Sequence, residues 1–254
     1  MSTMGQTWVL GQRALREVRR TPEALFPTLF IPLFFLVVNV GQAGKIFPSK
    51  GTDFLHGQGY GAFQLPSTLL LAASFGTASL FLVEEIEGGY FDKLRAAPVS
   101  RTALVLGRLV AEFVKALFIA SLIIVLALPL GVHVASGVLG FLLLIVFTAL
   151  WAVVYTGYMQ LLALKTRSAA ATQSASLVFF PLLFCTPNFV PRHLLTRPME
   201  IAATINPVTY LMEGLRSLIL QDFDWAVIGR GFAVIVVLGA LMLALSVRMI
   251  RSYD

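Results

Sequence analysis

The chain has 254 residues, of which 57% are hydrophobic and only 13% are charged, and its mean hydropathy is +0.84. This composition excludes a disordered chain, a coiled coil and a nucleic-acid-binding domain, and it disfavours a soluble enzyme, whose core could not bury so much apolar surface. The formal net charge of +6 therefore indicates contact with a membrane surface rather than with nucleic acid.

The first predicted element is an amphipathic helix within residues 1–24. Apolar and small residues at helical spacing form one face: Trp8, Gly11, Leu15 and Val18. Charged residues form another face: Arg13, Arg16, Glu17 and Arg20. Such a helix lies along the inner membrane surface, either as a basic anchor to anionic lipid head groups or as a docking surface for a partner.

Two apolar stretches follow, residues 25–41 and residues 63–83. Pro27 and Pro32 interrupt the first, and the second contains no charge. A helix of about 17–25 apolar residues crosses the hydrocarbon layer of a bilayer. Because backbone groups in lipid must be satisfied within their own segment, both stretches are predicted to cross the membrane as helices.

Residues 84–108 form the most charged stretch of the chain. Gly88 and Gly89 are predicted to end the second membrane helix, and a short helix is predicted from Tyr90 to Ala97. Pro98 then ends this helix, and Ser100 can cap the next one. The apolar side of the short helix comprises Tyr90, Phe91, Leu94 and Ala97. This side favours docking to a cytoplasmic partner, and the alternative is a solvated hairpin between two spans.

Four further crossings are predicted, at residues 109–130, 137–164, 168–191 and 231–247. Glu112 and Lys115 lie near the start of the first of these four. Snorkelling to the membrane surface and mutual pairing explain these two charges more simply than proton transfer does. A carrier driven by protons or sodium is therefore disfavoured.

Between the last two crossings, residues 192–228 are too apolar for a free loop. One short helix is predicted from Thr196 to Ile205, opening at Pro198. A second is predicted to begin at Asn206 as its N-cap, with Pro207 in its first turn. In the second helix Val208, Leu211, Leu215 and Leu218 share an apolar face. We expect Thr209, Glu213 and Arg216 on the other, exposed face, with Glu213 and Arg216 facing water or paired with each other. These helices either re-enter the membrane or only anchor its outer surface.

Six crossings place both termini on the same side of the membrane. Lys and Arg are about twice as frequent in the terminal segments and in the loops after the second and fourth crossings as in the remaining loops. Because cytoplasmic loops are rich in Lys and Arg, we predict that both termini are cytoplasmic in a multi-pass protein of the cell membrane.

No catalytic pattern accompanies this topology. A Walker-type phosphate loop, a zinc-ligand spacing and a G-x-S-x-G sequence are all missing from the chain. Either the function is passive, as in a channel or a secondary carrier, or a partner supplies the energy. A membrane enzyme acting on lipids needs a catalytic constellation that the sequence does not contain.

Two stretches resemble the membrane permeases of ABC exporters of the daunorubicin-resistance type. The first, GGYFDKLRAAPVSRTALVLGR at residues 88–108, resembles the cytoplasmic loop of that family. The second runs from FFPLLFCTPNFVP to INPVTYLMEGLR and resembles its outer signature. The chain departs from the family pattern at Glu85-Ile86, where a basic residue is common, and at residues 185–188, where small residues are common.

The resemblance implies an all-α half-transporter without cofactor, metal or catalytic residue of its own. A second, identical or related permease subunit and two ATP-binding cassette subunits, which hold ATP and magnesium, would complete it. The first, second and fifth spans would line the permease interface and the exit path. Cargo in this family comprises hydrophobic drugs, lipids, glycolipids and polysaccharide carriers, and the other partners are membrane lipids.

The resemblance also assigns three groups of site residues. Those that contact the ATPase would be Glu84, Glu87, Gly88, Phe91, Asp92, Lys93, Leu94, Arg95, Pro98, Ser100 and Arg101. Those by which the N-terminal helix docks would be Arg13, Arg16, Glu17 and Arg20. An outer gate helix would carry Asn206, Pro207, Thr209, Tyr210, Glu213 and Arg216.

Overall fold

The computed structural model describes residues 3–20, 22–75, 78–96, 99–221 and 223–251. These residues form helices and loops without a β-strand. The α-helices are α1 Thr3–Arg20, α2 Pro22–Ala43, α3 Tyr60–Ser74, α4 Ala78–Glu87, α5 Tyr90–Ala96, α6 Arg101–Ala127, α7 Gly137–Thr166, α8 Ala169–Ser176, α9 Phe179–Phe184, α10 Arg197–Ile205, α11 Pro207–Leu220 and α12 Trp225–Arg251. Three short 3-10 helices are η1 Asp53–Leu55, η2 Leu128–Leu130 and η3 Arg192–Leu194.

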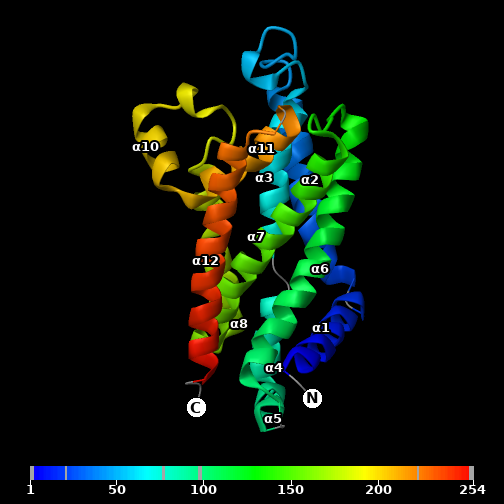
Figure 1. Cartoon of the computed structure of the whole chain (residues 1–254), viewed down its shortest axis with the longest axis vertical. Coiled ribbons are helices and arrows are strands. Elements are labelled where there is room, and N and C mark those ends of the chain that lie inside the picture. The colour runs from blue at the N-terminus through cyan, green and yellow to red at the C-terminus, as the bar shows by residue number, and fades with distance from the viewer. Residues whose placement is uncertain (1–2, 21, 76–77, 97–98, 222, 252–254) are drawn as a thin grey trace.

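The helices form an elongated bundle with two distinct ends (Figure 1). At one end lie α1, α4, α5 and the last turn of α12, and we call this the inner end. At the opposite end lie α10, α11 and the loop that joins α2 to α3, and we call this the outer end. The first helix and the last turn of α12 therefore lie at the same end of the bundle.

Within the described residues, four helices are long and apolar enough to cross a membrane. They cover Leu25–Ala43, Arg101–Leu130, Gly137–Thr166 and Trp225–Ile250. Their bounds match four of the six predicted crossings. Helix α6 begins before the apolar stretch, as the predicted cap implies: the Ser100 hydroxyl accepts a hydrogen bond from the Ala103 amide, at 3.1 Å.

The other two predicted crossings are not continuous helices. The stretch predicted at 63–83 divides into α3, which ends at Ser74, and α4. The stretch predicted at 168–191 divides into α8 and α9 around Leu177 and Val178. Pro181 explains the second division, because a proline ring clashes with the carbonyl group four residues earlier.

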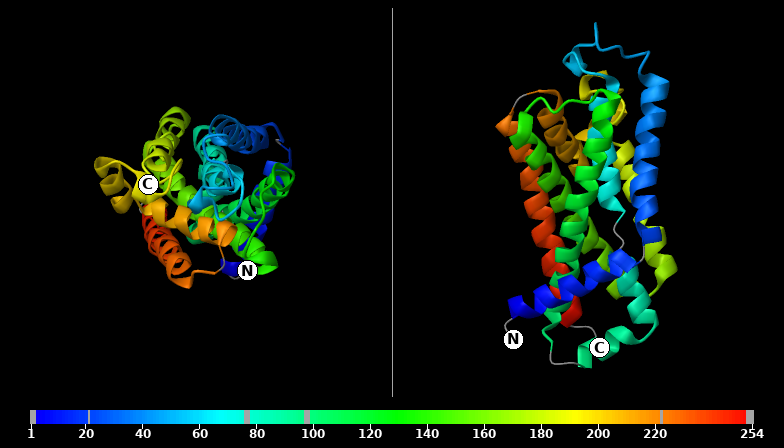
Figure 2. Two further views of the ribbon diagram at one scale, coloured as in Figure 1. Left: turned by 90° about the horizontal axis from the view of Figure 1, so that it is seen from above. Right: turned by 90° about the vertical axis from the view of Figure 1, so that its right-hand side faces the viewer.

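Helix α3 is the central helix of the bundle, and every one of its residues is buried. It is packed by α2, α6, α7 and α11 (Figure 2). The helices around α3 have apolar faces that point away from the bundle. On α2, for example, Phe26, Phe30 and Phe34 are each more than half exposed. An apolar exterior around a packed core is what a lipid environment requires.

Candidate functional site

The inner and the outer end of the bundle each combine buried charge with specific packing. At the inner end, α1 crosses the start of α6 at very short range. Gly11 and Gly107 make this crossing possible, since a Cβ atom on Gly107 would stand 2.7 Å from Cβ of Leu10 and 3.2 Å from the Gly11 amide. The Gln6 side chain also accepts a hydrogen bond from the Ser100 amide, at 2.9 Å.

The amphipathic faces predicted for the N-terminal helix are only partly correct. Gly11 and Val18 face α6 or its surroundings and are buried, but Trp8 is 58% exposed. Of the charged residues, Arg16 and Arg20 are exposed, whereas Arg13 and Glu17 are half-buried. The helix therefore docks on its own chain and still presents a basic surface to the outside.

Glu85 is the centre of an ion cluster that joins three helices at the inner end. One of its carboxylate oxygens pairs with Arg13 of α1 and the other with Arg108 of α6, while Glu85 itself belongs to α4. The carboxylate and Arg108 are both buried. The Arg13 guanidinium also lies over the Tyr90 ring of α5, 4.8 Å from its centroid. This cluster fixes α1, α4, α5 and α6 relative to one another.

Glu17 lies beside this cluster on α1. Burial raises the pKa of its carboxyl group, and the negative charge of Glu85 raises it further, while Arg108 and Arg13 oppose the shift. The cluster therefore has two carboxyl groups close to two guanidinium groups. No pattern in the sequence predicted the role of Glu85, which stood out only as a departure from the family pattern.

Next to the ion cluster, a small apolar core at the inner end contains residues of α4, α5, α6, α7 and α12. Phe91 is only 2% exposed there, and Leu94 packs against the same core. The apolar side that suggested docking to a partner thus packs, at Phe91, within this chain. The fully buried members of this core are Leu82, Val83, Phe91, Leu104, Val105, Leu109, Ala163, Leu164 and Ile250.

The remaining predicted contact residues of this loop are mostly on its surface. Glu84, Glu87, Gly88, Lys93 and Arg101 are exposed, and Ser100 is half-buried. The Glu87 carboxylate accepts a hydrogen bond from the Ala169 amide at the start of α8, at 2.8 Å. Pro98 and Ala97, and the side chains of Asp92 and Arg95, lie outside the described residues.

At the outer end, the predicted cap and apolar face of α11 are confirmed. The Asn206 side chain accepts a hydrogen bond from the Val208 amide, at 3.0 Å, and donates one to the Leu182 carbonyl. The four residues of the apolar face, Val208, Leu211, Leu215 and Leu218, are fully buried. The preceding helix also begins as predicted, after Thr196 and with Pro198 in its first turn.

The opposite face of α11 was predicted incorrectly, because it too is largely covered. Thr209 is fully buried and Arg216 is 9% exposed. Glu213 pairs with Arg192, at 3.0 Å, and not with Arg216. Arg216 instead donates to the carbonyl groups of Pro187, at 3.0 Å, and Phe63, at 3.3 Å. Tyr210 donates to the Thr204 carbonyl, at 2.7 Å, and so joins α11 to α10.

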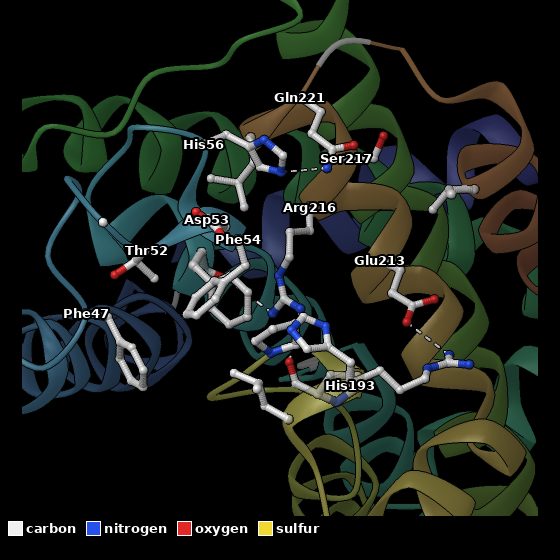
Figure 3. A pocket seen from close by; sticks show the side chains of 18 residues that line it. Phe47, Thr52, Asp53, Phe54, His56, His193, Glu213, Arg216, Ser217 and Gln221 are labelled. Carbon is white, nitrogen blue, oxygen red and sulfur yellow. Dashed lines mark hydrogen bonds and ion pairs between the residues drawn. The ribbon is translucent and has the colours of Figure 1, made fainter.

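A cavity of about 710 Å³ opens beside α11 at the outer end (Figure 3). Its walls come from the loop that carries η1, from η3 and from α11 itself. Charged, imidazole and aromatic groups converge on it, namely Asp53, His56, Arg192, His193, Glu213, Arg216, Phe47, Phe54 and Phe63. The sequence did not indicate this cavity, because its walls are distant in the chain.

The two charges within α6 are buried and paired. The Lys115 ammonium group lies 2.5 Å from the Glu112 carboxylate, and the two side chains are 5% and 2% exposed. Mutual pairing is therefore confirmed, but snorkelling is not, because neither group reaches the surface. Thr28 of α2 and Thr148 of α7 lie beside the pair.

These features describe a helical membrane bundle with a separately organised inner end. Comparison with known families assigns its class: residues 5–220 match the ABC-2 type transporter family, and the chain belongs to that family. It is a membrane permease of the ABC transporter class.

Two named relatives agree with this class. The chain is 24% identical to the daunorubicin resistance ABC transporter permease protein DrrB1 of Streptomyces coeruleorubidus, over 99% of this chain and 86% of that protein. It is 26% identical to a protein described as a transport permease, ycf38, of Porphyra purpurea, over 85% of this chain and 74% of that protein.

We expect Asn206→Ala to lower the apparent free energy of unfolding in mixed micelles by about 1–2 kcal/mol, because α11 loses its N-cap. Asn206→Ser retains a capping oxygen and should lose less than half as much. Denaturant titrations followed by circular dichroism compare the two variants. Equal losses would mean that the bond to Leu182, rather than the cap, makes the contribution.

Proposed function

We propose that this chain is the permease subunit of an ATP-driven exporter, which moves a hydrophobic or amphipathic molecule such as a drug, a lipid or a glycolipid out across the cell membrane. The ion cluster around Glu85 is the observation that supports this most. It connects α4, which directly precedes α5, to α1 and to the long helix α6, and Arg13 of the same cluster lies over Tyr90 of α5. A push on α5 from a partner would therefore reach a helix long enough to cross the membrane.

In this proposal the chain crosses the membrane six times. Two of the crossings are interrupted, α3 with α4 and α8 with α9, and both termini are cytoplasmic. Two copies of the chain, or this chain and a related permease, assemble with two ATP-binding cassette subunits. ATP and magnesium are bound by those subunits, and the surface of α1, α4 and α5 contacts them.

A pull-down of the full-length chain from native membranes tests the proposal. An ATP-binding subunit should co-purify in a complex whose ATPase activity is sensitive to this permease. Recovery of the permease alone, from membranes in which it is functional, would contradict the proposal.

The purified chain without partners is expected to hydrolyse no ATP, since it contains no phosphate-binding loop. The measurement is phosphate release by the isolated chain, with the reconstituted complex as the positive control. Hydrolysis by the isolated chain well above that of a mock purification would contradict the assignment of ATP to a partner.

Charge reversal at Lys93 is expected to reduce co-purification of the ATPase at least tenfold without lowering the thermal stability of the permease. Lys93 is exposed on α5, so its replacement by glutamate disturbs a surface and not the fold. Lys165→Glu is the matched control, because Lys165 is also exposed near the inner end but lies outside the loop. Equal recovery of ATPase with both variants would exclude α5 as the contact.

A secondary carrier that acts without an ATPase is the second candidate, and the buried Glu112–Lys115 pair is the observation in its favour. The second carboxylate oxygen of Glu112 has no hydrogen-bond partner. Proteoliposomes that contain only the permease separate the two candidates. Transport driven by an imposed proton gradient, and lost in Glu112→Gln, would favour the carrier.

A further inference from the structure

The outer cavity has the size and composition of a binding site for a small molecule. Its volume of about 710 Å³ lies within the range of about 300–1,000 Å³ that is usual for ligand sites. The loop before α3, the segment around η3 and α11 converge on it (Figure 3). None of the features that support the exporter function involves this cavity.

Arg216 gives the cavity an unusual charge. Its side chain lines the cavity although the residue is only 9% exposed. Its two hydrogen bonds go to neutral carbonyl groups, and its guanidinium carbon lies 3.6 Å from the centroid of the Phe63 ring. Its Nε atom is buried without a hydrogen-bond partner. A buried cation held in this way is costly unless an anion compensates it.

No carboxylate of the described chain forms an ion pair with Arg216. The nearest one in sequence, Glu213, is directed to Arg192, at 3.0 Å, as the dashed line in Figure 3 marks. The other carboxylate on the cavity wall belongs to Asp53, which is exposed. The His56 imidazole is hydrogen-bonded to the side-chain amide of Gln221, with 2.7 Å between the two Nε2 atoms. Glu213 is near enough to act on Arg216 electrostatically, but its carboxylate pairs with Arg192, so neither carboxylate of the cavity wall forms an ion pair with the Arg216 guanidinium.

The adjoining wall of the cavity is apolar and mostly aromatic. Phe47 and Phe54 have ring centroids 5.5 Å apart, and those of Phe54 and Phe63 are 5.0 Å apart. Leu194 adds an exposed aliphatic side chain. A ligand that fits both walls has an anionic group for Arg216 and an apolar part for the aromatic rings.

We propose that this cavity binds an anionic amphiphile, with Arg216 contacting a phosphate or carboxylate group and Phe47 and Phe54 contacting the apolar part. The proposal goes beyond the exporter function and does not depend on it. The ligand has two conceivable sources, a resident membrane lipid or an exchangeable amphiphile such as cargo, and both have the same chemistry.

Binding to the purified full-length chain in a neutral detergent tests the proposal. The probes are dihexanoyl phosphatidylglycerol, dihexanoyl phosphatidylcholine and inorganic phosphate, measured by titration calorimetry. We expect the phosphatidylglycerol to bind at least tenfold more tightly than either of the other two. Equal affinity for the anionic and the zwitterionic lipid would overturn the proposal, and so would inorganic phosphate that binds as tightly as phosphatidylglycerol.

Variants assign the binding to the cavity. Arg216→Gln should weaken phosphatidylglycerol binding at least tenfold, whereas Arg230→Gln, an exposed arginine outside the cavity, should not change it. If Arg216→Gln fails to fold, Leu194→Trp fills the cavity from an exposed position and should cause the same loss. Unchanged binding in a folded variant of either kind would overturn the proposal.

Native mass spectrometry of the protein from its own membranes distinguishes the two sources. An anionic lipid that co-purifies with the unmodified chain but not with Leu194→Trp identifies a resident lipid. Binding of added phosphatidylglycerol to a chain that carries no lipid identifies an exchangeable ligand. None of these measurements involves the ATPase, so their failure would leave the exporter proposal unaffected.

Discussion

Replacing Glu85 with glutamine is expected to lower the apparent free energy of unfolding by about 3–5 kcal/mol, because removal of one partner leaves a buried charge without compensation. Arg108 is 9% exposed and would keep its positive charge beside that of Arg13. The two guanidinium groups would then repel each other across the junction of α1 and α6. Denaturant titration in mixed micelles measures the loss, and transport by the assembled complex should fall with it.

Neighbouring carboxylates provide the controls for Glu85. Glu84 is exposed on the same helix, so Glu84→Gln should change stability by less than about 0.5 kcal/mol. Glu17→Gln should not lower stability at pH 7. The raised pKa of Glu17 makes its contribution to stability largest below its ordinary pKa, and this contribution is lost as the pH rises through the raised value. Similar losses for Glu84→Gln and Glu85→Gln would contradict the role of the cluster.

Replacing Gly107 with leucine is expected to separate α1 from α6. A Cβ atom at this position already meets Leu10 at 2.7 Å, and a longer side chain cannot be accommodated while α1 stays in place. We expect a loss of at least about 1–3 kcal/mol, as in other overpacked sites. Release of α1 should also speed tryptic cleavage at Arg16 and Arg20, which mass spectrometry follows.

Gly229 is the matched control for Gly107. It also lies within a helix, but no atom stands within 4 Å of a Cβ atom added there. Gly229→Ala should therefore leave tryptic cleavage of α1 unchanged and, through its higher helix propensity, should not destabilise the chain. If Gly107→Leu also leaves cleavage unchanged, the close crossing of α1 and α6 is not a tight contact.

Local signals in the sequence predicted the parts of the fold that local physics determines. The crossing at residues 137–164 corresponds to α7, since its apolar run is long and uninterrupted. The cap at Asn206 and the apolar face of α11 are correct for the same reason, because capping and helical periodicity act over a few residues.

Interruptions of apolar helices were harder to predict. Hydropathy measures whether a segment prefers lipid, and it does not show whether the backbone stays helical throughout. Pro181 is a visible signal for the division between α8 and α9, but a proline alone does not show that a span is interrupted, because membrane helices can also tolerate one. The end of α3 at Ser74 had no charged residue to mark it.

The site residues depended most on tertiary packing. Periodicity correctly separated Leu215 from Arg216, but it could not show that a second layer of protein covers Arg216. In the same way, the pattern around Phe91 revealed an apolar side without revealing that its partner is the same chain. Glu85 acquires its importance only when α1 and α6 bring their arginines to it.

The two interrupted segments contact each other in both halves of the bundle. In the outer half, α3 and α9 meet, and Gln64 donates to the Asn188 carbonyl, at 2.9 Å. In the inner half, α4 and α8 meet, and Glu87 accepts from the amide of Ala169. The two short helices α4 and α8 are therefore joined to each other at the inner end of the bundle. We expect a displacement of α5 to move α4 and α8 together, so that the inner parts of both interrupted segments respond to one signal.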